Sequence, residues 1–331
     1  MLPVLRFISR RLVLLAVATA CGFANAAATS PRLLERTDTH VVAAGDSLAS
    51  VASRYGVPPE LVAASNGLDP QASVLPDTQL RIVSRRLVPA PSFSDGVLVN
   101  VPQRLLFLYR GGVLVRSYPA AVGRPDWRTP LGDFAVINRL EDMDWYVPRS
   151  IQREMQREGK PVRTRVPPGP DNALGRHWIG LNMPGIGIHG TNEPDNVYGF
   201  VSHGCIRLHP DDIAQLFGQL KRGAIGTIAY VPLLLARDEA GVVWFEANPD
   251  AYDRAPASLD TVRAMAVEQG IDAASIDWAR VQAALDRRDG QAVEVGLDAQ
   301  SELRNLPGFM IPSGSKAVFS RRISAISTGD L

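Results

Sequence analysis

The feature that most restricts the fold is a series of short strand-like segments in residues 96–137. β-Branched and aromatic residues are frequent in Gly96 to Val101, Arg104 to Tyr109, Val113 to Tyr118 and Phe134 to Ile137. Turn residues, mostly glycine and proline, separate these segments. Many short strands joined by such turns predict a mainly β domain that is sandwich-like or barrel-like.

One amphipathic helix is predicted later in the same region. It begins at Pro210, because proline is favoured in the first turn of a helix, and it ends at Gly223. A last strand follows over Gly226 to Val231. We therefore expect residues 95–232 to form a mainly β domain with a few short helices. The apolar face of this helix contains Ile213, Leu216, Phe217 and Leu220.

A smaller pattern precedes this domain, in residues 39–83. A strand over residues 39–42, a helix capped by Asp46, a second helix over residues 59–65 and a strand over residues 79–83 give a βααβ order. The spacing of one buried helix face is i, i+3, i+4, i+7, and that face contains Leu48, Val51, Ala52 and Tyr55.

The first 26 residues have the parts of a secretory signal peptide. A basic start precedes the apolar run Leu12 to Ala20, and small residues mark a cleavage site after Ala26. This run is too short to span a bilayer, since a transmembrane helix needs about 20 residues. We therefore expect export to the periplasm. Ser9 to Arg11 leaves a twin-arginine route open, and Ala18 to Cys21 leaves a lipoprotein route open.

The remaining segments have weaker patterns. Residues 84–94, with prolines and serines, are expected to be a linker. A strand over residues 242–245 and helices over residues 260–268 and 276–287 predict an α-rich C-terminal extension, residues 233–331, with a poorly ordered tail. A net charge of +1 offers no electrostatic argument for nucleic-acid binding.

Cys205 is the candidate nucleophile. It lies in the run Ser202-His203-Gly204-Cys205-Ile206-Arg207, whereas Cys21, the other cysteine, lies in the predicted signal peptide. A single thiol in an oxidising compartment, with these neighbours, favours a reactive cysteine over a structural one. Because the thiolate is the attacking form, a partner must take the thiol proton or stabilise the negative charge.

Two histidines are candidates for this partner, His189 and His203. Residues two apart on an extended strand point the same way, but Gly204 is expected to bend the chain between His203 and Cys205. The residues alone therefore leave the choice open. The backbone amides of Gly204 and Cys205 are expected to form an oxyanion hole, because glycine lets a substrate come close.

These motifs resemble the catalytic domain of the L,D-transpeptidases, also called the YkuD domain, and in particular its ErfK/YbiS/YcfS/YnhG group. The resemblance starts from His189-Gly190-Thr191, followed thirteen residues after His189 by the run that begins at Ser202. One departure is Ala173, where the family commonly has proline. The likeness also includes Val122 and Gly123, Thr129 to Gly132, Trp145 and Pro148, Gly169 to Gly175, and Asp212 to Phe217.

The resemblance implies roles for particular residues. Cys205 is then the nucleophile, and His189 is the general base and later the general acid. Arg207 is expected to pair with a carboxylate of the substrate, since a guanidinium group matches a carboxylate in two-pronged fashion, and Thr191 is expected to contact the substrate. Supporting roles at the oxyanion hole are implied for His203, Gly204, Ser202 and Gly190.

Residues 39–83 resemble a LysM domain, a family that binds glycans containing N-acetylglucosamine. Gly45-Asp46, Tyr55 and Asn66 contribute to this likeness, whereas Asp77 stands where the family has a glycine. The alternative is a small scaffold domain that binds no sugar.

The two resemblances together imply acyl transfer on the tetrapeptide stems of peptidoglycan through a thioester on Cys205. The acceptor is left open. Another stem gives a 3-3 crosslink, a lysine of an outer-membrane lipoprotein gives anchoring to the wall, and water gives L,D-carboxypeptidase activity. No cofactor, metal or nucleic-acid partner is expected. Carbapenems are expected inhibitors, and the LysM domain is expected to hold the enzyme on the glycan.

Two rival functions remain. A zinc peptidase would use His189, His203 and Cys205 as metal ligands, with Glu193 or Asp195 as the base. A wall-binding protein without catalytic activity would need only the glycan-binding part.

Overall fold

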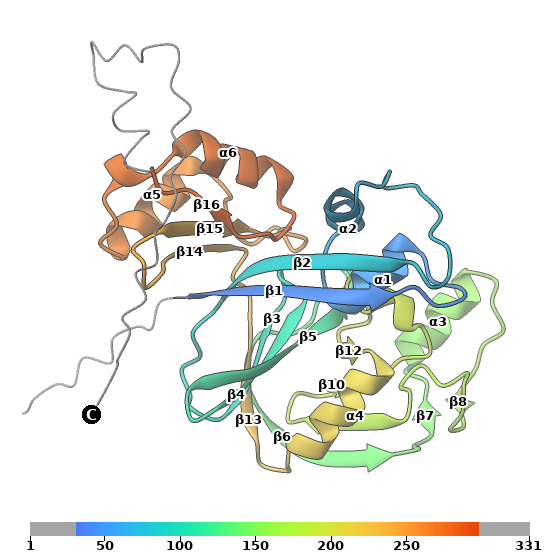
Figure 1. Cartoon of the computed structure of the whole chain (residues 1–331). Coiled ribbons are helices and arrows are strands. Elements are labelled where there is room, and N and C mark those ends of the chain that lie inside the picture. Colours follow the sequence, from blue (N-terminus) through green and yellow to red (C-terminus); the bar gives the residue numbers. More distant parts are fainter. Residues whose placement is uncertain (1–30, 298–331) are drawn as a thin grey trace, which may run out of the picture.

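The computed structural model describes residues 31–297, and within them a nine-stranded sheet forms the centre of the molecule (Figure 1). The strand order is β11-β5-β12-β10-β9-β6-β13-β3-β4, and β5 also pairs with β4, so the sheet closes on itself. The mainly β architecture predicted from the sequence is confirmed. The strands are β3 (Gly96–Asn100), β4 (Leu105–Arg110), β5 (Val113–Gly123), β6 (Gly132–Glu141), β9 (His177–Leu181), β10 (Gly187–His189), β11 (Phe200–Ser202), β12 (Ile206–Leu208) and β13 (Ile225–Ala229).

Helix α4 (Pro210–Gln219) covers part of this sheet. Its Ile213, Leu216 and Leu220 are fully buried in the same core as the inward-facing residues of the strands, which confirms the predicted apolar face. Phe217 is only partly buried against this core. The helix ends before Gly223, because the backbone at Leu220 is already extended, with φ −91° and ψ 119°.

The N-terminal domain consists of two paired strands and two helices, in the predicted order. The apolar face of its first helix is buried against the second strand, with Leu48 and Val51 in the same core as Leu80 and Ile82. The elements are β1 (Arg32–Val41), α1 (Leu48–Tyr55), α2 (Pro59–Asn66) and β2 (Gln79–Val88).

The cap of α1 differs from the expectation. Ser47, not Asp46, is the N-cap, and it forms a reciprocal capping box with Ser50. Asp46 accepts a hydrogen bond from the N–H of Ala43 and lies 2.9 Å from Nε2 of His40. The carboxylate of Asp46 therefore stabilises the turn before the helix.

The strands of this domain are longer than predicted. They pair in register from Arg32 opposite Val88 to Val41 opposite Gln79. The expected linker, residues 84–94, is therefore a strand over its first five residues, and Leu87 and Val88 are buried. The extension is stable because it packs on the C-terminal part of the chain, where Leu87 shares a cluster with Leu234 and Trp244.

The C-terminal part contains the two expected helices and a three-stranded sheet that share one core. The predicted signal peptide and the predicted tail beyond residue 297 lie outside the described residues. Across residues 31–297, no helix combines the length and the apolar character needed to cross a bilayer. The elements are β14 (Leu233–Arg237), β15 (Val243–Ala247), α5 (Leu259–Glu268), the 3₁₀ turn η2 (Ala273–Ser275), α6 (Trp278–Arg287) and β16 (Val293–Glu294).

A further group of elements lies beside the central sheet and had no signal in the apolar pattern. Helix α3 is the largest of them, and Glu154 is its only buried residue. The group is β7 (Trp145–Tyr146), α3 (Arg149–Arg157), β8 (Arg165–Val166) and the 3₁₀ turn η1 (Pro194–Asn196).

Candidate active site

The end of one strand and the start of its neighbour bring the two leading candidates together. His189 is the last residue of β10, and Cys205 immediately precedes β12. These strands pair in parallel, with Ile188 opposite Ile206. Cys205 and His189 line one cavity of about 270 Å³, together with His203, Arg207 and the aromatic side chains of Trp145, Tyr146 and Trp178.

His189 is held as a neutral base. Its side chain is buried and stacks on Trp178, with ring centroids 5.5 Å apart. Nδ1 lies 2.7 Å from the carbonyl oxygen of Gly190, which can only accept, so Nδ1 carries the proton. Burial, with a smaller effect from the charge of Arg207, lowers the pKa of His189 to about 3. The second ring nitrogen, Nε2, is therefore unprotonated at neutral pH.

Cys205 is half-buried, and its surroundings favour the protonated thiol. Burial raises the pKa of Cys205, although a hydrogen bond from the backbone at Gly187 and the charge of Arg207 oppose that shift. Its Sγ atom lies 3.5 Å from the carbonyl oxygen of Gly185. The resting pair is therefore a thiol beside a neutral imidazole.

The turn from residue 202 to residue 205 exposes one backbone donor. The hydroxyl of Ser202 donates to the carbonyl oxygen of Cys205 at 2.5 Å and accepts from the N–H of Gly204 at 3.1 Å. Gly204 has φ +106°, a backbone conformation that favours glycine. The N–H of Cys205 makes no hydrogen bond to residues 31–297, whereas that of Gly204 is already occupied.

His203 faces a different partner from His189. Its Nε2 is hydrogen-bonded to the carboxylate of Glu154, and its ring lies edge-on to Trp127, with centroids 4.8 Å apart. Glu154 also forms an ion pair with Arg124. Burial raises the pKa of Glu154, but hydrogen bonds from Arg124 and His203 outweigh it and hold that pKa below its usual range. The carboxylate is therefore ionised and fixes the ring of His203.

The remaining candidates divide into two groups. Arg207 lines the cavity, and its buried Nε atom has no hydrogen-bond partner in the described chain. Thr191 is buried outside this cavity, and its hydroxyl accepts from the N–H of Glu193 at 2.9 Å. Gly190 also lies outside the cavity lining and packs closely on Gly175, where a Cβ at Gly175 would lie 3.0 Å from Cα of Gly190.

Sequence reasoning missed three residues that contact the candidate histidines. Glu154 lies on a helix without an apolar face, so no periodic pattern marked it. Trp127 and Trp178 are large aromatic residues in turn and strand segments, and only the fold shows that they flank His203 and His189. For the two tryptophans, the one signal in the sequence was the general enrichment of aromatic residues near binding sites.

Comparison with known proteins follows the division seen in the fold. The sequence model of the L,D-transpeptidase catalytic domain (YkuD) matches residues 94–231, and that of the LysM domain matches residues 40–83. A Salmonella typhimurium protein named "Probable L,D-transpeptidase ErfK/SrfK" is 31% identical over 220 residues, which are 64% of this chain and 69% of that protein. An Escherichia coli protein named "Probable L,D-transpeptidase YcfS" is 30% identical over 257 residues, 74% of this chain and 79% of that protein.

Among solved structures, the catalytic domain of an E. faecium L,D-transpeptidase acylated by ertapenem matches 42% of this chain and 100% of that chain. The sequence identity is 22% and the TM-score is 0.32, so this likeness carries no argument about function. The two relatives and the two domain matches, by contrast, show the family of the chain. The chain belongs to the L,D-transpeptidase family, with a YkuD catalytic domain and an N-terminal LysM domain.

Proposed function

We propose that this protein is a cysteine-dependent acyltransferase that acts on tetrapeptide stems of peptidoglycan. The observation that carries the proposal is the shared cavity, which is lined by the neutral imidazole of His189, at the end of β10, and by the thiol of Cys205, just before the neighbouring parallel strand β12. A thiol with a neighbouring neutral base is the arrangement that nucleophilic acyl transfer needs.

The first half-reaction forms a thioester. Nε2 of His189 takes the proton of the thiol as Sγ of Cys205 attacks the carbonyl carbon of the third stem residue, meso-diaminopimelate. The carbonyl oxygen becomes an oxyanion, and the N–H of Cys205, which makes no hydrogen bond to the described residues, donates to it. The tetrahedral intermediate then breaks the bond to the terminal D-alanine, whose amine leaves with the proton from His189.

The second half-reaction transfers the acyl group. An amine attacks the thioester carbon, His189 takes a proton from that amine, and the thiol of Cys205 is restored. The side-chain amine of another stem gives a 3-3 crosslink, and a lysine of an outer-membrane lipoprotein gives anchoring to the wall. Water in place of the amine gives carboxypeptidase activity.

Residues around the reacting pair support this chemistry. Arg207 lines the cavity, and its guanidinium group suits a carboxylate of the stem. His203 borders the same cavity and is fixed by Glu154, so it shapes the wall of the site. The LysM domain supports binding to the glycan strand. A wall substrate agrees with the export to the periplasm that the sequence predicts.

A zinc peptidase has less support. Within residues 31–297, no group of three or more His, Cys, Asp or Glu side chains is placed to hold a metal ion. Nε2 of His203 is engaged by Glu154 and is therefore not available as a zinc ligand.

The test is mass spectrometry of the purified enzyme with soluble tetrapeptide muropeptides and with a carbapenem. We expect an adduct on Cys205 in the wild type and no turnover in Cys205→Ser, because a hydroxyl is a far weaker nucleophile beside the same base. His189→Ala should slow acylation by about 10²- to 10⁴-fold, whereas His209→Ala, outside the cavity, should not. Turnover without any adduct at Cys205 would remove the proposal.

A further inference from the structure

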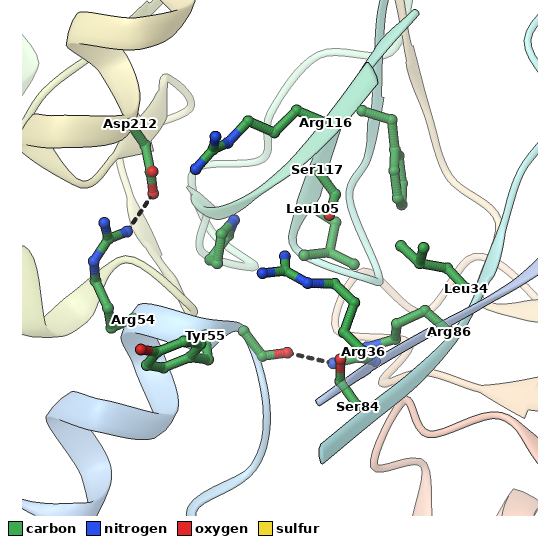
Figure 2. A pocket seen from close by; sticks show the side chains of 13 residues that line it. Leu34, Arg36, Arg54, Tyr55, Ser84, Arg86, Leu105, Arg116, Ser117 and Asp212 are labelled. Carbon is green, nitrogen blue, oxygen red and sulfur yellow. Dashed lines mark hydrogen bonds and ion pairs between the residues drawn. The ribbon is translucent and has the colours of Figure 1, made fainter. Parts of the chain in front are cut away.

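A second cavity lies between the N-terminal domain and the central sheet, and no residue of the active-site cavity lines it (Figure 2). Strands β1 and β2 and the end of α1 form one side, and strands β4 and β5 and helix α4 form the other. Its volume is about 130 Å³, enough for a small group but not for a whole disaccharide. The cavity therefore lies where the N-terminal domain meets the central sheet.

Positive charge dominates the lining of this cavity. Arg36, Arg54 and Arg86 come from the N-terminal domain and Arg116 comes from β5, whereas Asp212 is the only carboxylate among the lining residues. Three carboxylates outside the lining lie within 4.0 Å of these arginines: Asp38 pairs with Arg36, Asp211 with Arg54 and Glu246 with Arg86. Arg116 has no such partner among the described residues, and a concave surface lined by guanidinium groups favours ions of the opposite sign.

Two of these arginines already have partners. Arg54 donates to the carboxylate of Asp212 at 2.6 Å, and that carboxylate is buried. Arg86 is buried and donates to the carbonyl oxygens of Gly56 and Gly290, and it also lies 3.7 Å from Glu246. These two side chains build the wall of the cavity.

The other two arginines are available. Arg36 has one ion pair, with Asp38 at 3.1 Å, and both side chains are substantially exposed, at 47% and 33%. An exposed pair of this kind contributes little. Arg116 has no carboxylate within 4.0 Å in the described part of the chain. Its guanidinium group lies over the ring of Tyr118, 5.5 Å from the ring centroid. Figure 2 shows the guanidinium groups of Arg36 and Arg116 directed into the same space.

Two serine hydroxyl groups also line the cavity. Ser84 lies directly opposite Arg36 in the pairing of β1 with β2, and Ser117 follows Arg116 on β5. Neither hydroxyl makes a hydrogen bond to residues 31–297. The space between the domains is thus bordered by two available guanidinium groups and two available hydroxyl donors.

We infer that this cavity binds an oxyanion, a carboxylate or a phosphate group, between Arg36 and Arg116. Guanidinium groups recognise both kinds of group through paired charge-assisted hydrogen bonds. The bound group links the LysM domain to the catalytic sheet. One source is a carboxylate of a peptidoglycan stem, which rests on the proposed function, and the other is free phosphate.

Isothermal titration calorimetry on the full chain tests this site with two probes, inorganic phosphate and the dipeptide L-Ala-γ-D-Glu. The test variant is Arg36→Gln/Arg116→Gln, and the control is Arg81→Gln/Arg222→Gln, which removes one exposed arginine from each domain without touching the cavity. We expect saturable binding by the wild type and the control, and binding at least about tenfold weaker in the test variant. Raising the ionic strength should weaken binding in the wild type.

Each outcome is decisive. Binding of the dipeptide identifies a stem carboxylate as the source, and binding of phosphate alone identifies free phosphate. Equal affinity in the wild type and the test variant, or no saturation by either probe, overturns the inference. Ser117→Asp supplies a second variant, since a carboxylate in the cavity should abolish binding. Turnover of soluble tetrapeptide should persist in all these variants, so a failure of the proposed function is detected separately.

Discussion

The side chains of Cys205 and His189 lie in surroundings that favour their uncharged forms. Burial lowers the pKa of His189 to about 3, and Arg207 adds to that shift. Burial also raises the pKa of Cys205, although Arg207 opposes the shift there. The free enzyme therefore holds a thiol and an imidazole rather than a thiolate and an imidazolium ion. In the proposed reaction, the proton therefore moves during the attack on the substrate, not before it.

Alkylation kinetics distinguish these two resting states. We expect the rate of reaction of Cys205 with iodoacetamide to rise continuously with pH and to reach half its maximum only above the ordinary cysteine pKa, because burial disfavours the thiolate. The measurement is the rate of adduct formation by mass spectrometry between about pH 5 and pH 10. A plateau on the acidic side of neutrality, abolished in His189→Ala, would instead establish a preformed ion pair.

The neutral form of His189 also links folding to pH. Its pKa is about 3 in the folded protein and 6.5 in an unperturbed histidine, so below pH 6.5 the unfolded chain binds a proton that the folded protein does not. The free energy of unfolding therefore falls as the pH drops from 6.5 towards 3. At pH 4.5 this loss is about 3 kcal/mol for the single group.

Urea denaturation of the wild type and of His189→Asn at pH 7.5 and 4.5 isolates this contribution. Asparagine is uncharged at both pH values, and its amide can still donate to the carbonyl oxygen of Gly190. The variant should lose about 3 kcal/mol less than the wild type between the two pH values. An identical loss in both proteins contradicts a buried neutral His189.

At the scale of single elements, helix α3 depends on one charged residue. The helix has nine residues, and Glu154 is its only buried side chain. An isolated helix shorter than about 12 residues is marginal in water. The contacts of Glu154 with Arg124 and His203 therefore dock α3 beside the active site.

Glu154→Ala should release α3 from this position, because it removes two charge-assisted contacts worth about 1.5–3 kcal/mol each. We expect the amides of residues 149–157 to exchange hydrogen at least about tenfold faster, with slower acylation of Cys205. Glu158→Ala is the matched control, since Glu158 is exposed and its one ion pair within residues 31–297 is with Lys160. Unchanged exchange in Glu154→Ala means that other contacts hold the helix.

The sequence predicted best the elements whose own residues carry the signal for burial. The strands β3, β4 and β5 and the apolar face of α4 were located because each carries its own apolar residues between turn residues. The longer ends of β1 and β2 were missed because Leu87 is buried by Leu234 and Trp244, far away in the sequence. Helix α3 was missed because polar contacts, not an apolar face, hold it.

The candidate site follows the same rule. Cys205 and His189 were proposed from their neighbours and from the family resemblance, and the fold places both in one cavity. The residues alone left the choice between His189 and His203 open, and the family resemblance favoured His189. The fold distinguishes the two histidines through the parallel pairing of β10 with β12 and through the contact between His203 and Glu154. Neither is local in the sequence, so spacing could not decide it. The roles of these residues remain predictions.

At the scale of the whole molecule, a buried polar network joins three parts of the chain. Glu246 of β15 is fully buried and accepts hydrogen bonds from the N–H of Leu87 and from the side chain of Gln103. It also lies 3.7 Å from Arg86 of β2, which donates to Gly56 and Gly290. The N-terminal domain, the catalytic sheet and the C-terminal part therefore share one set of hydrogen bonds.

The C-terminal part also reaches the loop beside the active site. The hydroxyl of Tyr252 donates to the carbonyl oxygen of Gly123 at 2.7 Å and accepts from the N–H of Thr129 at 2.9 Å. This loop carries Trp127, which contacts His203. The chain beyond the catalytic domain thus supports the site, although the YkuD match ends at residue 231.

Glu246 lies in the C-terminal part and contacts the other two parts. Its loss should therefore allow the three parts to unfold at different temperatures. Glu246→Ala leaves Arg86 buried without its carboxylate partner, and breaking a buried pair in this way costs about 3–5 kcal/mol. Differential scanning calorimetry should show one transition for the wild type and a lower, broader or divided transition for the variant. Glu239→Ala, at an exposed turn between β14 and β15, should behave like the wild type. If Glu246→Ala melts with the wild type in a single transition, the three parts are held together by apolar packing alone, and the network only fills the space between them.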